Sequence, residues 1–153
     1  MIKNIRNTEY GLVGEMYFSL FDRNIEVSID DELMIEYANI CAEYLNSLND
    51  EVINQFCLAA IRYCNEFLSD IGEDEIGFNK PSDVLTLIKP KSLTVPDPQN
   101  GLEPVIDMEL DCEWEEEHGM ELIIRNDTVL YVGAYYGENP WGDYTNKKSW
   151  NYA

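Results

Sequence analysis

Residues 105–115, with the sequence VIDMELDCEWE, alternate between apolar and acidic side chains from Ile106 onwards. Successive side chains of a β-strand point to opposite faces of its sheet, so this pattern predicts a strand with one buried and one exposed face. The expected buried set is Ile106, Met108, Leu110, Cys112 and Trp114, and the expected exposed set is Asp107, Glu109, Asp111, Glu113 and Glu115.

The five carboxylates of this strand are the strongest indication of a binding surface in the sequence. Neighbours on one face of a strand lie about 7 Å apart, so these carboxylates would repel one another without helping the chain to fold. Either they keep the protein soluble or they contact a partner. The sequence leaves these two alternatives equally open.

The composition indicates a single globular domain over residues 1–153. Apolar residues make up 45% of the chain, which is more than a disordered chain contains. The net charge is −20, from 30 acidic residues and 10 Lys or Arg residues. Nucleic acids and anionic membranes are bound mainly through Lys and Arg, so we expect neither as a partner. If the charge serves binding, it favours a basic protein.

The cysteines and the apolar segments indicate a cytoplasmic protein. Cys41, Cys57, Cys64 and Cys112 lack the spacing of metal ligands, and each lies among apolar residues. On a helix, Cys57 and Cys64 would be about 10 Å apart, which is beyond the reach of a disulfide. We therefore expect reduced, buried thiols. We also expect no signal peptide and no membrane span, because no apolar run has the required position or length.

The first half of the sequence predicts a β-hairpin followed by two helices. Alternating apolar residues within the range 14–29 flank residues 22–24, which would form the turn. Apolar residues at three- and four-residue steps, beginning with Leu33, then predict amphipathic helices near 33–48 and 53–68. Asp30 or Asp31 would cap the first helix and Asp50 the second. Because the connection is short, we expect the two helices to pack antiparallel to each other.

The second half predicts a mostly antiparallel sheet and completes an α+β fold with the helices packed on one face. An edge strand at 91–95 would precede the acidic strand, and residues 115–119 would turn the chain. A second hairpin, placed inside the sheet because both its faces are apolar, would turn at Asn126 and Asp127, which tolerate a positive φ. Its expected pairs are Arg125–Thr128, Ile123–Leu130 and Leu122–Tyr131.

The only histidine, His118, carries the main enzymatic alternative. A single histidine excludes metal sites and catalytic schemes that need two imidazoles. Glu116, Glu117 and His118 could bind a divalent cation or supply a catalytic base, but consecutive residues in a turn rarely converge on one point. We favour a structural turn in which Gly119 has a positive φ and the imidazole contacts a carboxylate or a backbone carbonyl. We expect no catalytic residue, no metal and no cofactor, since a glycine-rich phosphate loop is also missing.

Seven of the chain's aromatic residues lie within its last 23 residues. Tyr and Trp often anchor protein interfaces, but such rings also hold irregular segments against a sheet. Both alternatives stay open. We assign Tyr135 and Trp141, together with the five carboxylates, to a candidate partner-binding face on which carboxylates attract a basic protein and rings hold it.

The segment DCEWEEEHGMEL at residues 111–122 resembles the Trp-x-x-Glu-His-Gly signature of an uncharacterised bacterial family, here Trp114, Glu117, His118 and Gly119. The first half resembles the same family through its Phe-x-x-x-Ile-x-Val hairpin at residues 21–27. The hairpin turn departs from the Asp-Gly pattern, because Thr128 follows Asp127. The resemblance implies no catalytic residue. Small acidic proteins of this kind are similar to immunity proteins, which bind and block toxins.

The sequence therefore predicts a non-enzymatic, cytoplasmic protein-binding domain, in particular an immunity-type inhibitor of a basic toxin. The second hypothesis is an enzyme or metal-binding protein that uses the neighbourhood of Glu117 and His118. The third is a structural or oligomer-forming domain. The oligomeric state and the identity of a partner are not indicated by the sequence.

Overall fold

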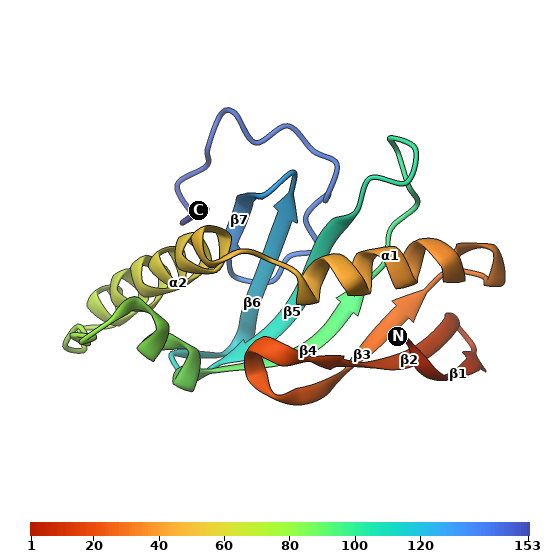
Figure 1. The fold of residues 1–153 in the computed structure, drawn as a ribbon. Helices are drawn as coiled ribbons and strands as arrows, with labels where there is room; N and C mark the ends of the chain where they lie inside the picture. Colours follow the sequence, from red (N-terminus) through yellow and green to blue (C-terminus); the bar gives the residue numbers. More distant parts are fainter.

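The computed structural model describes residues 1–153 and contains seven strands, two α-helices and three short 3-10 helices (Figure 1). The strands are β1 (Lys3–Thr8), β2 (Gly11–Phe18), β3 (Arg23–Ile29), β4 (Ile88–Thr94), β5 (Val105–Cys112), β6 (Glu115–Arg125) and β7 (Thr128–Gly133). The helices are α1 (Ile35–Asn46) and α2 (Asp50–Asp70), with the short 3-10 helices η1 (Ser19–Phe21), η2 (Glu32–Met34) and η3 (Pro81–Leu87). None of the helices combines the length and the apolar composition needed to span a membrane.

All seven strands form one sheet, and their order in space is their order along the chain. Every neighbouring pair is antiparallel except β3 and β4, which are parallel. A parallel pair needs a long connection, and both α-helices lie within this one. The expected α+β class is thus confirmed. β4, the strand expected at the edge of the sheet, lies at its centre. β1 was not expected from the sequence.

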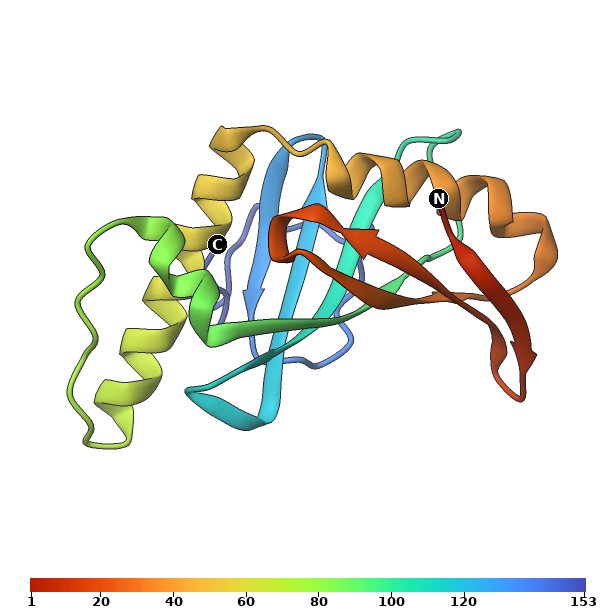
Figure 2. The same ribbon diagram turned by 60° about the horizontal axis from the view of Figure 1, so that its bottom comes forward.

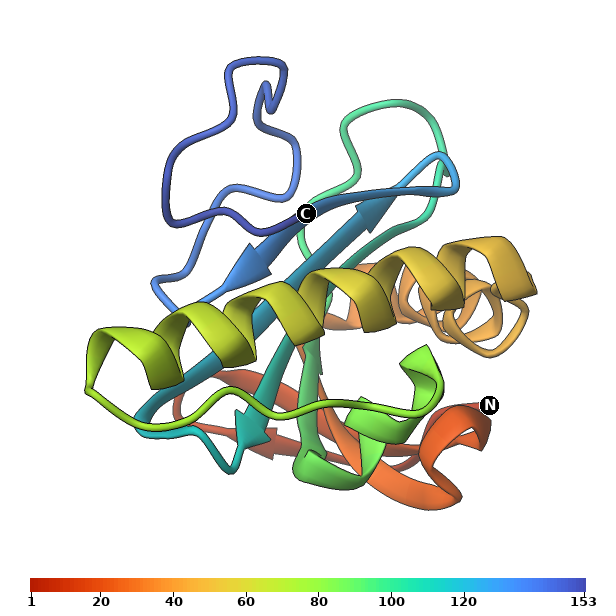
Figure 3. The same ribbon diagram turned by 90° about the vertical axis from the view of Figure 1, so that its left-hand side faces the viewer.

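The two α-helices cover one face of the sheet but run in different directions. Figure 2 shows α1 crossing the strands of the first half while α2 lies beside β7. Figure 3 looks almost along α1, whereas α2 runs across the view. In agreement, α1 contacts β2 and β5, and α2 contacts β7 and η3. The two helices therefore do not pack along each other as expected, because each buries its apolar side against a different part of this wide sheet.

The helix ends differ from the expectation by one or two residues. Asp31 accepts a hydrogen bond from the Leu33 N–H, but it caps the short helix η2, so α1 begins only at Ile35. As a result Leu33 is 92% exposed instead of buried. Asn49, not Asp50, caps α2 by accepting a hydrogen bond from the Val52 N–H.

The register of β5 is the expected one, but the strand is shorter. All five apolar side chains expected to be buried are buried: Ile106, Met108, Leu110, Cys112 and Trp114. Cys112 pairs with Glu115, so the chain turns at residues 113–114 and not at 115–119. The carboxylates therefore do not form one row of five. Asp107, Glu109 and Asp111 belong to β5, Glu113 lies in the turn and Glu115 begins β6.

The hairpin of β6 and β7 has the expected turn and a different register. Asn126 and Asp127 have φ angles of 53° and 55°, and Arg125 pairs with Thr128 as expected. The register then shifts, because one residue of β7 is left without a partner. The observed pairs are Ile124–Val129, Ile123–Tyr131, Leu122–Val132 and Glu121–Gly133.

Residues 134–153, called the C-terminal segment below, return to β7 and extend the sheet contacts beyond its edge. The Tyr152 N–H donates to the Val132 carbonyl at 2.8 Å. The Asn151 side chain donates to the Leu130 carbonyl at 2.8 Å and accepts from the Val132 N–H at 3.3 Å. The hairpin of β6 and β7 was expected inside the sheet, but β7 is the edge strand. The C-terminal segment covers this edge.

Candidate functional site

The carboxylates of the predicted binding face separate into an outer and an inner group. Asp111 and Glu113 are exposed, as are Glu116 and Glu117 of β6. Asp107, farther along β5, is partly buried. Glu109 lies between the two groups, partly buried, with an oxygen 3.5 Å from the Lys91 Nζ.

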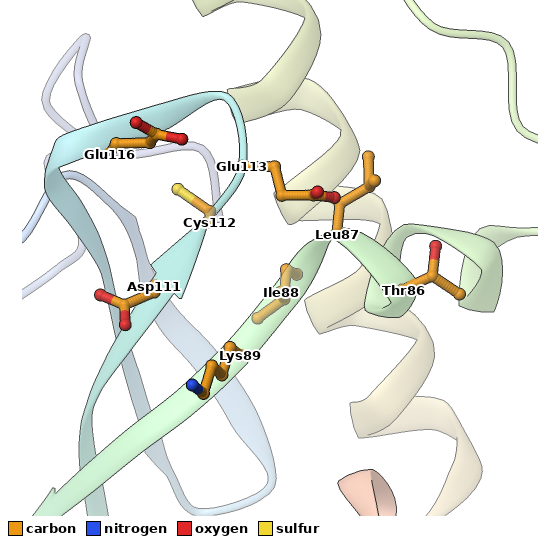
Figure 4. Close-up of a pocket in the computed structure, with 8 residues that line it drawn as sticks. All are labelled: Thr86, Leu87, Ile88, Lys89, Asp111, Cys112, Glu113 and Glu116. Carbon is orange, nitrogen blue, oxygen red and sulfur yellow. The ribbon is translucent and has the colours of Figure 1, made fainter.

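Asp111, Glu113 and Glu116 of the outer group line a cavity of about 520 Å³ between the start of β4 and the β5–β6 turn (Figure 4). A backbone hydrogen bond of 3.0 Å from the Glu113 N–H to the Leu87 carbonyl joins its two sides. The apolar part of the wall comes from Leu87, Ile88 and Cys112, and the charged part from Asp111, Glu113, Glu116 and Lys89. Three carboxylates against one ammonium group give the cavity an excess of negative charge.

A second cavity, of about 250 Å³, adjoins the first and shares Asp111 and Glu116 with it. Its other side chains include Glu109, Glu117 and the exposed ring of Tyr135. We call the carboxylates around the two cavities the acidic surface: Glu109, Asp111, Glu113, Glu116 and Glu117. The structure thus brings together four of the predicted binding residues, Glu109, Asp111, Glu113 and Tyr135, and adds Glu116 and Glu117 to them.

His118 has the expected contact with a carboxylate, although it lies in β6 and not in a turn. Its Nδ1 is 3.2 Å from a Glu115 carboxylate oxygen. The other oxygen of Glu115 accepts hydrogen bonds from the N–H groups of Glu117 and His118. Gly119 has the expected positive φ, 67°, and a Cβ there would lie 2.6 Å from the Leu110 carbonyl oxygen. This position therefore requires glycine, because β6 bends closely past β5.

Glu115, Glu117 and His118 are also the side chains best placed to hold a metal ion. Their potential ligand atoms lie within 4.8 Å of one another. Glu115 thus takes the place that the sequence assigned to Glu116. However, both Glu115 oxygens already have hydrogen-bond partners within this short segment, which favours the structural role.

Trp114 and Gly119 both contact Tyr63 of α2. The Trp114 ring is buried and meets the Tyr63 ring edge-on, with 5.5 Å between ring centroids. The Tyr63 hydroxyl donates to the Gly119 carbonyl at 2.9 Å. Trp114 and Gly119 therefore fix the β5–β6 turn against the helix.

The inner group contains Glu121, which the sequence analysis missed. Glu121 is fully buried, and its carboxylate accepts hydrogen bonds of 3.0–3.3 Å from the N–H groups of Tyr136, Gly137 and Glu138. Burial, and then the adjacent Glu121 carboxyl group, raise the pKa of Asp107 to about 9. The one feature of the sequence that could have indicated a buried carboxylate is the position of Glu121, as a single acidic residue within the apolar run 120–124.

The aromatic residues of the C-terminal region divide into rings that pack within the chain and rings that stay exposed. The Trp141 Nε1–H donates to the Asp97 carbonyl at 2.9 Å, and its ring lies 5.8 Å from the guanidinium carbon of Arg125. Trp141 therefore packs within the chain and does not join the acidic surface. Tyr152 likewise stacks on Tyr63. In contrast, three rings stay exposed: Tyr135, Tyr136 and Trp150.

The sequence profile of a family described as a domain of unknown function (DUF6985) matches residues 1–140. This range contains the whole sheet, both α-helices and the acidic surface, so the expectation of an uncharacterised family is confirmed. No curated protein and no solved structure matches the chain.

Proposed function

The chain belongs to the DUF6985 family, a domain of unknown function, and we propose that it is a non-enzymatic binding domain for a basic protein. One observation carries this proposal: Asp111 and Glu116 line two adjoining cavities at the same end of the sheet. Each cavity combines carboxylates with apolar or aromatic wall. That combination suits Lys and Arg, whose long stems pack on apolar surface while their charged groups meet carboxylates.

The charges on the acidic surface are largely uncompensated. Among its five carboxylates only Glu109 has an ion-pair partner, Lys91. Lys89 lines the first cavity without forming an ion pair. Exposed carboxylates that repel one another contribute nothing to folding, but they attract a basic partner and accelerate its association.

In its specific form, the proposal is that this domain is an immunity-type inhibitor of a basic toxin in the cytoplasm. An inhibitor of this kind needs a rigid, pre-formed surface, because ordering a loop on binding would weaken the complex. The acidic surface meets this requirement, since its carboxylates lie on β5, on β6 and in the tight turn between them. The four buried cysteines, none of them in a disulfide, suit a reducing compartment.

The test is the association rate of purified basic proteins encoded beside its gene, measured by biolayer interferometry. The wild type is compared with Asp111→Asn/Glu116→Gln at 0.1 M and 1 M salt, where the Debye length is about 10 Å and about 3 Å. We expect the double variant to associate roughly 3–10-fold more slowly at low salt and to have a smaller salt dependence.

A matched control removes the same charge from the opposite side of the molecule. Glu36 and Glu43 are exposed on α1, so Glu36→Gln/Glu43→Gln changes the net charge equally without touching the acidic surface. Equal slowing in both double variants would mean that only net charge matters and would contradict the proposal. It is also contradicted if no basic protein binds the wild type, and a concentration-dependent self-association would then favour the oligomer-forming alternative.

A further inference from the structure

Two exposed rings and one carboxylate of the C-terminal segment line a further open cavity of about 400 Å³. These residues are Tyr136, Glu138 and Trp150. Tyr136 is 63% exposed and Trp150 is 47% exposed, although both are large side chains that proteins usually cover. The Tyr136 ring lies 6.2 Å from the ring of His118, which lines the second cavity of the acidic surface. The aromatic cavity and the acidic surface are therefore neighbours.

Three carboxyl groups lie close together behind this cavity. Glu138 and Glu121 both interact with Asp107 and raise its pKa, so the three carboxyl groups form one cluster. None of the three takes part in an ion pair. The guanidinium of Arg125 donates instead to the carbonyls of Pro140 and Gly142. Lys148 lines the adjoining cavity with Glu138 and Trp150 but forms no ion pair. The Glu138 carboxylate is thus left without an ion-pair partner in the chain.

We infer that the cavity between Tyr136, Glu138 and Trp150 receives a Lys or Arg side chain of the protein partner. The faces of aromatic rings are electron-rich and attract cations, and Trp does so most strongly. A carboxylate beside two such rings selects a positively charged group over a neutral one of the same shape. This inference rests on the proposed function, because the partner bound at the acidic surface supplies the side chain.

The openness of the site favours a side chain of a bound protein over a free small cation. Only three residues line the cavity, so they would leave most of a free ammonium compound in water. A partner already held by the neighbouring acidic surface would instead present its side chain at high effective concentration.

The test follows the indole N–H signals of the three tryptophans by NMR during titration with the peptide acetyl-Gly-Gly-Lys-Gly-Gly-amide. The Trp150 signal is expected to shift and is assigned by its loss in Trp150→Leu. Trp141 is the internal control, because its Nε1–H is already bonded to the Asp97 carbonyl. The matched peptide replaces Lys with norleucine, which has a similar stem and no charge. Tetramethylammonium chloride tests the free cation.

The variant Glu138→Gln tests the role of the side-chain carboxylate independently of the backbone N–H of residue 138. The N–H of residue 138, which bonds Glu121, is kept in this variant, so the C-terminal segment should stay in place. We expect Glu138→Gln to weaken binding of the Lys peptide by about 3–30-fold, the range of one cation–π or screened ionic contact. The control Glu43→Gln should leave binding unchanged.

Equal shifts of Trp150 with the Lys and norleucine peptides would overturn the inference. So would tetramethylammonium binding as tightly as the Lys peptide, or a Trp150 signal that does not move. These failures are distinguishable from failure of the proposed function: a basic protein that binds the wild type and Trp150→Leu equally well refutes only the cationic pocket.

Discussion

The carboxyl groups of Asp107 and Glu121 interact across neighbouring strands, in the part of the sheet that the C-terminal segment covers. Glu121 accepts hydrogen bonds from three N–H groups of that segment. Asp107 has no such donors, and its pKa is raised to about 9 by burial and by Glu121. At neutral pH the carboxyl group of Asp107 is therefore protonated, and it shares a side-chain hydrogen bond with Glu121.

The raised pKa of Asp107 makes stability depend on pH. An unfolded Asp has a pKa of about 3.9, so the folded state binds the proton more tightly than the unfolded state does. This stabilising contribution is complete below pH 4 and is lost as the pH rises towards 9. Asp107→Asn keeps a neutral donor at all pH values and should raise the free energy of unfolding by about 1–3 kcal/mol at pH 8.

Urea unfolding of the wild type and Asp107→Asn at pH 5 and pH 8 measures this difference. The gain should be clearly smaller at pH 5, because the free-energy cost of keeping a proton on folded Asp107 grows with each pH unit above the unfolded pKa. A gain that is equal at the two pH values would show that Asp107 is ionised in the folded protein.

Glu121 should be the residue that keeps the C-terminal segment on the sheet. Glu121→Gln removes the charge and one acceptor oxygen, and hydrogen bonds to charged groups contribute about 1.5–3 kcal/mol. We expect a loss of that order and faster hydrogen exchange at the N–H groups of Tyr136, Gly137 and Glu138. Glu109→Gln is the matched control, because Glu109 lies opposite Glu121 on the neighbouring strand but is partly exposed. Unchanged protection of the three N–H groups in Glu121→Gln would contradict this role.

The same residues show what the sequence could and could not predict. The alternation around Leu110 is local, so it predicted the buried face of β5 correctly. Glu121 was missed because its donors lie 15–17 residues later, in a segment without periodicity. The register of β7 was wrong for a similar reason, since nothing in the sequence marks the unpaired residue.

The candidate site was predictable only in part. Asp111 and Glu113 were expected on the surface from their alternation with apolar residues, and both are exposed. Glu116 joins them because a two-residue turn follows β5, whereas the charged run 115–117 suggested a longer turn. The pattern of acidic residues continued through the turn, and alternation alone does not mark where a strand ends.

Leu110 should contribute strongly to the core between the sheet and the helices. It is fully buried on the helix-covered face of β5, so Leu110→Ala should lower the free energy of unfolding by about 2–5 kcal/mol. Leu33→Ala provides the control, because Leu33 is 92% exposed and its replacement should change stability by less than about 0.5 kcal/mol. Similar losses in the two variants would mean that β5 does not form the centre of the core.

The neighbourhood of His118 should not bind zinc tightly. A zinc site would need the Glu115 carboxylate, but its oxygens already bond the His118 ring and two backbone N–H groups. The remaining ligands, Glu117 and His118, are exposed, and two ligands do not complete the four that zinc prefers. We therefore expect no stoichiometric heat on calorimetric titration with zinc and no rise in the melting temperature. Stoichiometric binding that disappears in both Glu117→Gln and His118→Asn would instead support the metal-binding alternative, because only a shared ion would make these two exposed side chains act together.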